Sequence, residues 1–159
     1  GGEVDLIVRK LNQLVAEGLD FDQVVDVITT YQSKTKLLFV LAKVDNLVKN
    51  GRLSKLIGTV VGLLNIRMVG EASKTGTLEL LQKARGQKKA IKAAFDELIK
   101  AGYNGGHITI AHRNNEKFIE QFSALVREKF AHAMIEVLPT SGLCSFYAEE
   151  GGLLMGYEI

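Results

Sequence analysis

The segment Thr35–Leu41 reads TKLLFVL, a short apolar run bounded by charged residues. It is too short to form a helix of its own, and Phe39 and Val40 are residue types enriched in strands. A continuous apolar run of this length is typical of a buried strand. The segment therefore predicts a strand in the interior of the protein.

Two β-rich stretches, 65–72 and 77–84, follow further along the chain. They are joined by the sequence SKTG, whose Gly76 can adopt the positive φ that a hairpin turn requires. An antiparallel hairpin is therefore predicted. Alternating or apolar runs predict three more strands, at 107–112, 132–138 and 153–158.

Helices are predicted where apolar residues recur at steps of three and four. Segments 4–17 and 20–28 form a pair of amphipathic helices that we expect to pack together, with Phe21 and Val25 on the buried face of the second. Further helices are expected at 45–50, 54–64, 87–101 and 115–126, whereas 141–150 is expected to be irregular. The predicted fold class is α/β (α+β two-layer), with about six strands in a mixed, largely antiparallel sheet packed with helices.

Composition excludes several classes of function. The 159 residues carry a formal net charge of +2 with no Trp, which is not the basic and aromatic footprint of a nucleic-acid binder. The apolar runs are shorter than the roughly 18 residues of a membrane span. Cys144 is the single cysteine, so an internal disulfide is excluded and a reducing cytoplasm is the expected location.

Residues able to carry chemistry are present but lack the required spacing. The three histidines, at 107, 112 and 132, lie on separate predicted elements without metal-ligand spacing. Cys144 has no identifiable partner histidine for nucleophilic catalysis. Gly58 and Gly62 are not followed by the Lys and Ser or Thr of a phosphate loop. We therefore expect neither an enzyme nor a metal or cofactor site.

Two arginines follow or precede a glycine at a predicted turn. Arg85 is followed by Gly86 and by the basic residues Lys88 and Lys89, and Arg52 follows Gly51 at the start of a predicted helix. A positive charge is unfavourable at a helix N-terminus, so the dipole does not account for Arg52. These residues form either a solvated surface or a site for an acidic partner or an anionic group.

Four short motifs occur in a defined order: NGRL at 50–53, LLNI at 63–66, KARGQKKA at 83–90 and YAEEGGL at 147–153. Together with the strand and helix that begin at Ile108, they resemble the C-terminal half of the bacterial DegV family over nearly the whole chain. The resemblance implies an α/β lipid-binding domain at 34–159. It also implies that residues 1–33 are a helical pair linking this domain to an N-terminal domain that the sequence does not include.

The resemblance also implies a function. Members of this family bind a long-chain fatty acid between two α/β domains, and in Gram-positive bacteria some present it to a kinase that phosphorylates the carboxylate, while the binding protein does no chemistry. Arg52 and Arg85 match family positions that face the kinase or the head group, and Lys88 lies next to Arg85. Tyr147 stands where many members have a histidine. Its hydroxyl can donate a hydrogen bond to a carboxylate but carries no positive charge.

An acyl chain stabilises its complex by about 0.8 kcal/mol for each buried CH₂, so apolar side chains alone can hold it. We expect a tunnel lined by Phe39, Leu64, Ile66 and Met155, although the same residue types also suit an ordinary core. The competing hypothesis is an interaction module that docks an acidic partner through its basic edge without lipid. Under the first hypothesis, the face that meets the missing domain is apolar and can cause self-association.

Overall fold

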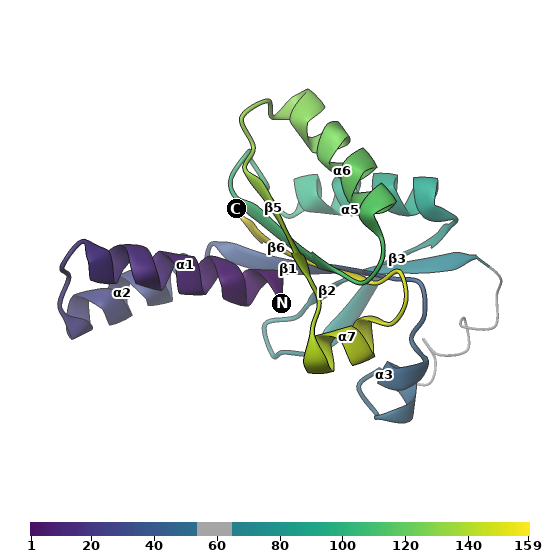
Figure 1. Ribbon diagram of the computed structural model, residues 1–159, viewed down its shortest axis with the longest axis horizontal. Helices are drawn as coiled ribbons and strands as arrows, with labels where there is room; N and C mark the ends of the chain where they lie inside the picture. Colours follow the sequence, from purple (N-terminus) through teal and green to yellow (C-terminus); the bar gives the residue numbers. More distant parts are fainter. Residues whose placement is uncertain (54–64) are drawn as a thin grey trace.

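The computed structural model describes residues 1–53 and 65–159, and its centre is a six-stranded sheet with the order β3-β2-β1-β6-β4-β5 (Figure 1). Within these ranges β4 and β5 pair in parallel, and the other neighbouring strands pair antiparallel. The predicted mixed sheet is therefore confirmed. Its strands are β1 (Thr35–Leu41), β2 (Ile66–Ala72), β3 (Leu78–Arg85), β4 (Ile108–His112), β5 (Ile135–Pro139) and β6 (Leu153–Glu158).

Helices lie on both sides of the sheet. Figure 1 shows α5 and α6 on one side, α3 and α7 on the other, and the pair α1 and α2 extending from one end. The helix predicted at 54–64 lies outside the described residues. The described helices are α1 (Gly2–Ala16), α2 (Phe21–Gln32), α3 (Asp45–Lys49), α5 (Gln87–Lys100), α6 (Glu116–Lys129) and α7 (Gly142–Ala148).

The expectation that 141–150 is irregular was wrong, because α7 occupies most of it. Ser141, at the N-cap, makes no side-chain hydrogen bond that would mark the start of the helix. The helix is instead held by tertiary contacts, with Ala148 buried and Tyr147 packed against an apolar cluster. Such contacts override a weak local signal.

The predicted buried strand is confirmed as β1, which lies between β2 and β6. Its side chains alternate between the two faces of the sheet. Leu38 and Val40 join the core under α5 and α6, and Phe39 and Leu41 join a smaller cluster under α3 and α7. Because all four are buried, the run is apolar at consecutive positions.

The larger core fills the space between the sheet and the helices α5 and α6. Aromatic and aliphatic side chains dominate it, and the largest that are fully buried include Tyr157, Phe118 and Phe122. Each such side chain stabilises the fold by about 1.5–3 kcal/mol through removal of apolar surface from water. This core therefore covers one face of the sheet with tightly buried side chains, whereas the opposite face is only partly covered.

Helix α1 packs on that second face against β6 and β4. Leu6 and Leu14 are its buried apolar side chains. Arg9 bridges two carboxylates, with Nε 2.7 Å from Asp5 Oδ2 and a terminal nitrogen 2.6 Å from Glu136 Oε2 on β5. Helix α1 is therefore attached to the sheet by both apolar and ionic contacts.

Helix α2 packs mainly on α1, as predicted, but the expected buried face was wrong. None of its residues is buried, and Phe21 is 80% and Val25 42% exposed. The helix starts at a capping box, in which the Asp20 side chain accepts a hydrogen bond from Gln23 N. Periodicity identified the apolar stripe but could not tell that the described residues cover it only in part, leaving Val24 and Ile28 half-buried.

The burial of Tyr103 in the larger core can be tested through the ionisation of its hydroxyl. The side chain is 4% exposed, and its hydroxyl donates a hydrogen bond to Gly106 O at 2.8 Å. Burial, together with the nearby Glu158 carboxylate, raises the pKa of Tyr103 to about 12. The folded pKa exceeds the ordinary value of about 10. The stability that the protein gains by burying the neutral Tyr103 hydroxyl is therefore complete below pH ~10 and is lost as pH rises towards 12.

We expect Tyr103→Phe to reduce the loss of unfolding free energy between pH 10 and 12 by up to about 3 kcal/mol. Urea denaturation at a series of alkaline pH values measures the effect. Equal slopes in the variant and the wild type would show that Tyr103 ionises as freely in the folded state as in the unfolded one.

Candidate ligand-binding site

An apolar pocket of about 160 Å³ lies on the partly covered face of the sheet, beneath α3 and α7. Its lining is free of charged side chains among the described residues. We call it the apolar pocket, and its lining residues are Phe39, Leu41, Leu47, Leu78, Leu143, Cys144, Tyr147, Ala148 and Leu154.

The strand register determines which side chains form the floor of this pocket. Phe39 on β1 lies directly opposite Leu154 on β6 and Gly70 on β2. Directly opposed residues of antiparallel strands point to the same face, and so do residues two apart in one strand. Leu41 therefore continues the floor along β1, and Leu78 adds to it from β3.

Hydrogen bonds join the two helices that cover the floor. Asn46 of α3 donates from its backbone N–H to the Glu149 carboxylate at 3.1 Å and from its side chain to Phe146 O at 2.9 Å. Glu149 immediately follows α7 and is itself buried. The contacts hold α3 and α7 together as one rim of the apolar pocket.

Two of the predicted tunnel and head-group residues, Phe39 and Tyr147, line this pocket. Met155 does not, because it is fully buried in the core on the opposite face of the sheet, and its neighbour Leu154 takes the pocket position. Ile66 is half-buried at the start of β2 and does not line the pocket. Leu64 lies outside the described residues.

The predicted partner-binding residues Arg52, Arg85 and Lys88 are all exposed. Arg85 pairs with Ile66, which is two residues from Met68, so Arg85 lies on the pocket face of the sheet. Arg52 follows α3, which covers that same face. Lys88 is in the first turn of α5, which covers the other face. The two arginines therefore border the pocket face, and Lys88 does not.

Sequence reasoning missed several lining residues, among them Leu41, Leu143 and Leu154. The period of two in β1 could have paired Leu41 with Phe39 on one face. Leu143 and Tyr147 are four residues apart, which is helical spacing, but the stretch was expected to be irregular. Leu154 could not be chosen over Met155, because the sequence around β6 is apolar on both faces.

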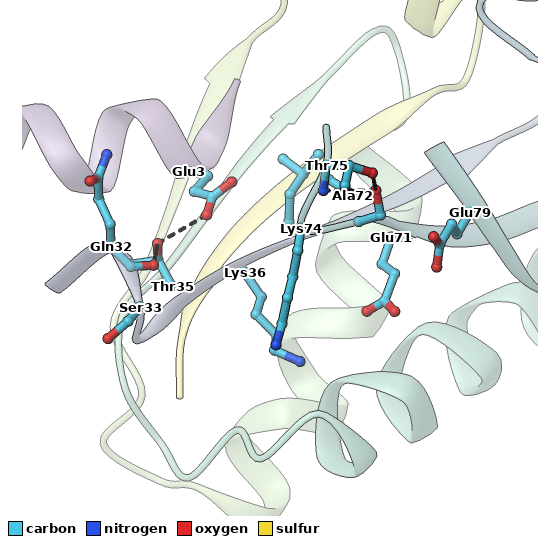
Figure 2. Close-up of a pocket in the computed structure, with 12 residues that line it drawn as sticks. Glu3, Gln32, Ser33, Thr35, Lys36, Glu71, Ala72, Lys74, Thr75 and Glu79 are labelled. Atoms are coloured by element: carbon cyan, nitrogen blue, oxygen red, sulfur yellow. Dashed lines mark hydrogen bonds between the residues drawn. The ribbon is translucent and has the colours of Figure 1, made fainter. Parts of the chain in front are cut away.

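A polar groove of about 820 Å³ adjoins the pocket face, and Figure 2 shows the side chains around it. Thr35 Oγ1 donates to Glu3 Oε1 at 2.9 Å across one side (dashed in Figure 2). Lysines and carboxylates from β1, β2 and the hairpin turn surround the rest. We call it the polar groove, and its lining comprises Glu3, Gln32, Ser33, Thr35, Lys36, Leu37, Glu71, Ala72, Ser73, Lys74, Thr75 and Glu79.

Residues 1–53 and 65–159 lack two other features, a metal site and a membrane span. No group of His, Cys, Asp and Glu side chains there is arranged to hold a metal ion. None of the helices in those ranges has the length and hydropathy needed to cross a membrane.

Comparison with known proteins connects this geometry with a family. The model of the DegV family, described as uncharacterised proteins, matches residues 1–157. A DegV domain-containing protein from Streptococcus gordonii is 76% identical over all 159 residues. The crystal structure of the Streptococcus pneumoniae fatty acid kinase (Fak) B3 protein loaded with linoleic acid matches 100% of the chain with 75% identity and a TM-score of 0.98.

A more distant structure has the same fold. A DegV family protein from Eubacterium eligens loaded with heptadecanoic acid is 35% identical, with a TM-score of 0.95 over 99% of the chain. The chain spans 57% of the length of each of these three proteins. The fold, the ordered motifs and the match over residues 1–157 lead to one conclusion, that the chain belongs to the DegV family.

Proposed function

We propose that this chain is the acyl-chain-binding part of a cytoplasmic protein that binds a long-chain fatty acid. The observation that supports this most directly is the apolar pocket, whose described lining has no charged group and therefore suits a hydrocarbon chain. Related structures from Streptococcus pneumoniae and Eubacterium eligens contain linoleic and heptadecanoic acid. The ligand is held by burial of its methylene groups, at about 0.8 kcal/mol each.

The described pocket is too small to enclose a long-chain ligand. Pockets for small molecules usually measure about 300–1,000 Å³, whereas this one measures about 160 Å³. The curated relatives are longer, since the chain spans 57% of their length. We infer that the remaining part of a longer protein completes the site and covers the ligand, as in a family whose members bind the fatty acid between two domains.

The proposed role of the polar residues is to hold and present the head group. The Tyr147 hydroxyl can donate a hydrogen bond to a carboxylate, and Arg52 and Arg85 border the pocket face with guanidinium groups suited to carboxylate or phosphate. In this proposal the protein presents the carboxylate to the catalytic subunit of a fatty acid kinase and performs no reaction itself. The name of the Streptococcus pneumoniae neighbour supports this partner.

The binding proposal is tested with delipidated full-length protein, compared with the 159-residue chain, in titrations with palmitate and oleate. We expect micromolar or tighter binding by the full-length protein and at least about tenfold weaker binding by the shorter chain, a difference of about 1.4 kcal/mol. Failure of the full-length protein to bind either fatty acid would overturn the proposal.

Presentation to the kinase is tested separately with Arg52→Glu and Arg85→Glu. We expect each variant to lower the rate at which a fatty acid kinase phosphorylates the bound fatty acid by more than it lowers fatty-acid affinity, because burial of the acyl chain supplies most of the binding energy. Kinase binding that is equally strong without any lipid would instead favour the alternative, a lipid-independent interaction module with a basic edge. Binding of either kind should weaken with salt, because the pairing is electrostatic.

Self-association of the 159-residue chain is a further expectation. Val4, Val8 and Val15 on α1, together with Phe21 and Val25 on α2, expose an apolar surface of a kind that usually marks a contact site. We expect concentration-dependent dimers in sedimentation experiments, and their loss in the double variant Val8→Lys, Phe21→Lys. A monomer at every concentration would contradict the expectation.

A further inference from the structure

We propose that Phe39, seated on Gly70, separates the apolar pocket from the polar groove and thereby limits the length of the acyl chain that the protein accepts. The inference rests on the proposed fatty-acid-binding function and deepens it. It assigns chain-length selection to one aromatic side chain at the centre of the sheet.

The first step is the contact between Phe39 and Gly70. The two residues are directly opposed in the β1–β2 register, on the pocket face of the sheet. A Cβ atom added to Gly70 would overlap Phe39 Cζ and the backbone oxygen of Glu79. The phenyl ring therefore occupies the space directly above Gly70, and glycine at this position is what permits the ring to lie there.

The second step is the position of this ring between the two cavities. Along β1, Leu41 lies two residues to one side of Phe39 and lines the apolar pocket, and Leu37 lies two residues to the other side and lines the polar groove. The same order holds on β2, where Ala72 lies two residues from Gly70 and also lines the groove. Along β1, Phe39 is thus the last side chain that lines the pocket before the groove begins.

The third step concerns what lies beyond the ring. The floor stays apolar for one more pair of residues, Leu37 and Ala72, and then becomes polar at the hydrogen bond between Thr35 and Glu3. Figure 2 shows Lys36, Lys74 and Glu71 around the same groove. If the ring is absent, a hydrocarbon chain can therefore extend along the floor by one further step, the distance from Phe39 to Leu37, before it reaches polar groups.

The length of that step follows from strand geometry. Residues two apart in a strand are separated by about 6.7 Å. A zigzag of carbon–carbon bonds of about 1.5 Å advances about 1.25 Å per bond. Removing the ring therefore extends the available path by about five carbons.

The experiment uses the full-length protein with Phe39→Ala and with the milder Phe39→Leu, each offered an equimolar ladder of saturated fatty acids of increasing length. Mass spectrometry of the bound lipid reports the preferred length. We expect the maximum to move to longer chains by up to about five carbons in Phe39→Ala, and by less in Phe39→Leu. Phe39→Leu keeps an apolar side chain at the site. If Phe39→Ala does not fold, the preferred fatty-acid length is therefore measured with Phe39→Leu.

Leu41→Ala is the matched control, because it removes an apolar side chain from the same pocket on the side away from the groove. We expect it to weaken binding without changing the preferred length. An unchanged length profile in folded Phe39 variants, or an equal shift in Leu41→Ala, would overturn the inference and leave fatty-acid binding intact. A wild-type protein that binds no fatty acid would remove the proposed function as well.

Discussion

Gly156→Ala is expected to release α1 from the sheet. A Cβ at position 156 would overlap the backbone nitrogen and Cα of Glu3 and the carbonyl carbon of Gly2. These are backbone atoms, so the overlap cannot be relieved by a side-chain rotation. The helix must move away, which exposes Leu6 and Leu14 at a cost of about 1.5–3 kcal/mol each. We expect a total loss of about 3–6 kcal/mol from the unfolding free energy.

Hydrogen exchange resolved by residue distinguishes this local release from general destabilisation. Amides of α1 and α2 should lose protection in Gly156→Ala while those of α5 and α6 retain it. Gly1→Ala is the matched control, because its added Cβ would make only an ordinary contact with Leu154 at 3.8 Å. Unchanged protection of α1 in Gly156→Ala would show that the helix does not depend on this close approach.

Leu78→Glu is expected to abolish most fatty-acid binding by the full-length protein. Leu78 lines the apolar pocket from β3, at the edge of the sheet, so the substitution places a carboxylate beside the hydrocarbon chain. An acyl chain cannot compensate the lost hydration of that charge. We expect affinity to fall at least about 30-fold, equivalent to about 2 kcal/mol, in titrations with palmitate.

Leu81→Glu is its control on the same strand. Leu81 is 37% exposed, does not line the pocket, and is skipped in the pairing at the bulge opposite Val69 and Gly70. The same change of residue type there should leave affinity within about twofold of wild type, since no pocket contact is altered. Equal losses in the two variants would mean that added charge, rather than the pocket, lowers the affinity.

The accuracy of the sequence predictions varied with how local the signal was. Residues Thr35–Leu41 formed the expected strand, and Gly76 closed the expected hairpin, because both depend on neighbouring residues. Helix α7 was missed because its stability comes from contacts with the sheet and with α3. The exposed side of α2 was assigned to a core because an apolar stripe looks the same whether or not a neighbour covers it.

The candidate site shows the same contrast between local and tertiary information. Phe39 and Tyr147 both line the apolar pocket, whereas Met155, also expected in the tunnel, lies in the core on the opposite face and Leu154 lines the pocket in its place. Arg52 and Arg85 were recognised by their place beside a glycine. Their positions depend on tertiary structure. The strand register places Arg85 on the pocket face, and the face that α5 covers places Lys88 on the other side of the sheet.

By itself, the sequence determined the strands of the sheet, most of the helices and, through its ordered motifs, the family. Only the tertiary structure decided which side chains share a face, that Phe39 lies over Gly70, and that one side of the sheet holds an apolar pocket next to a polar groove. The physical reason is that the formation of a strand depends on the apolar pattern of adjacent residues. In contrast, the face that a side chain shares with residues of another strand depends on register, and contacts between residues distant in sequence set that register.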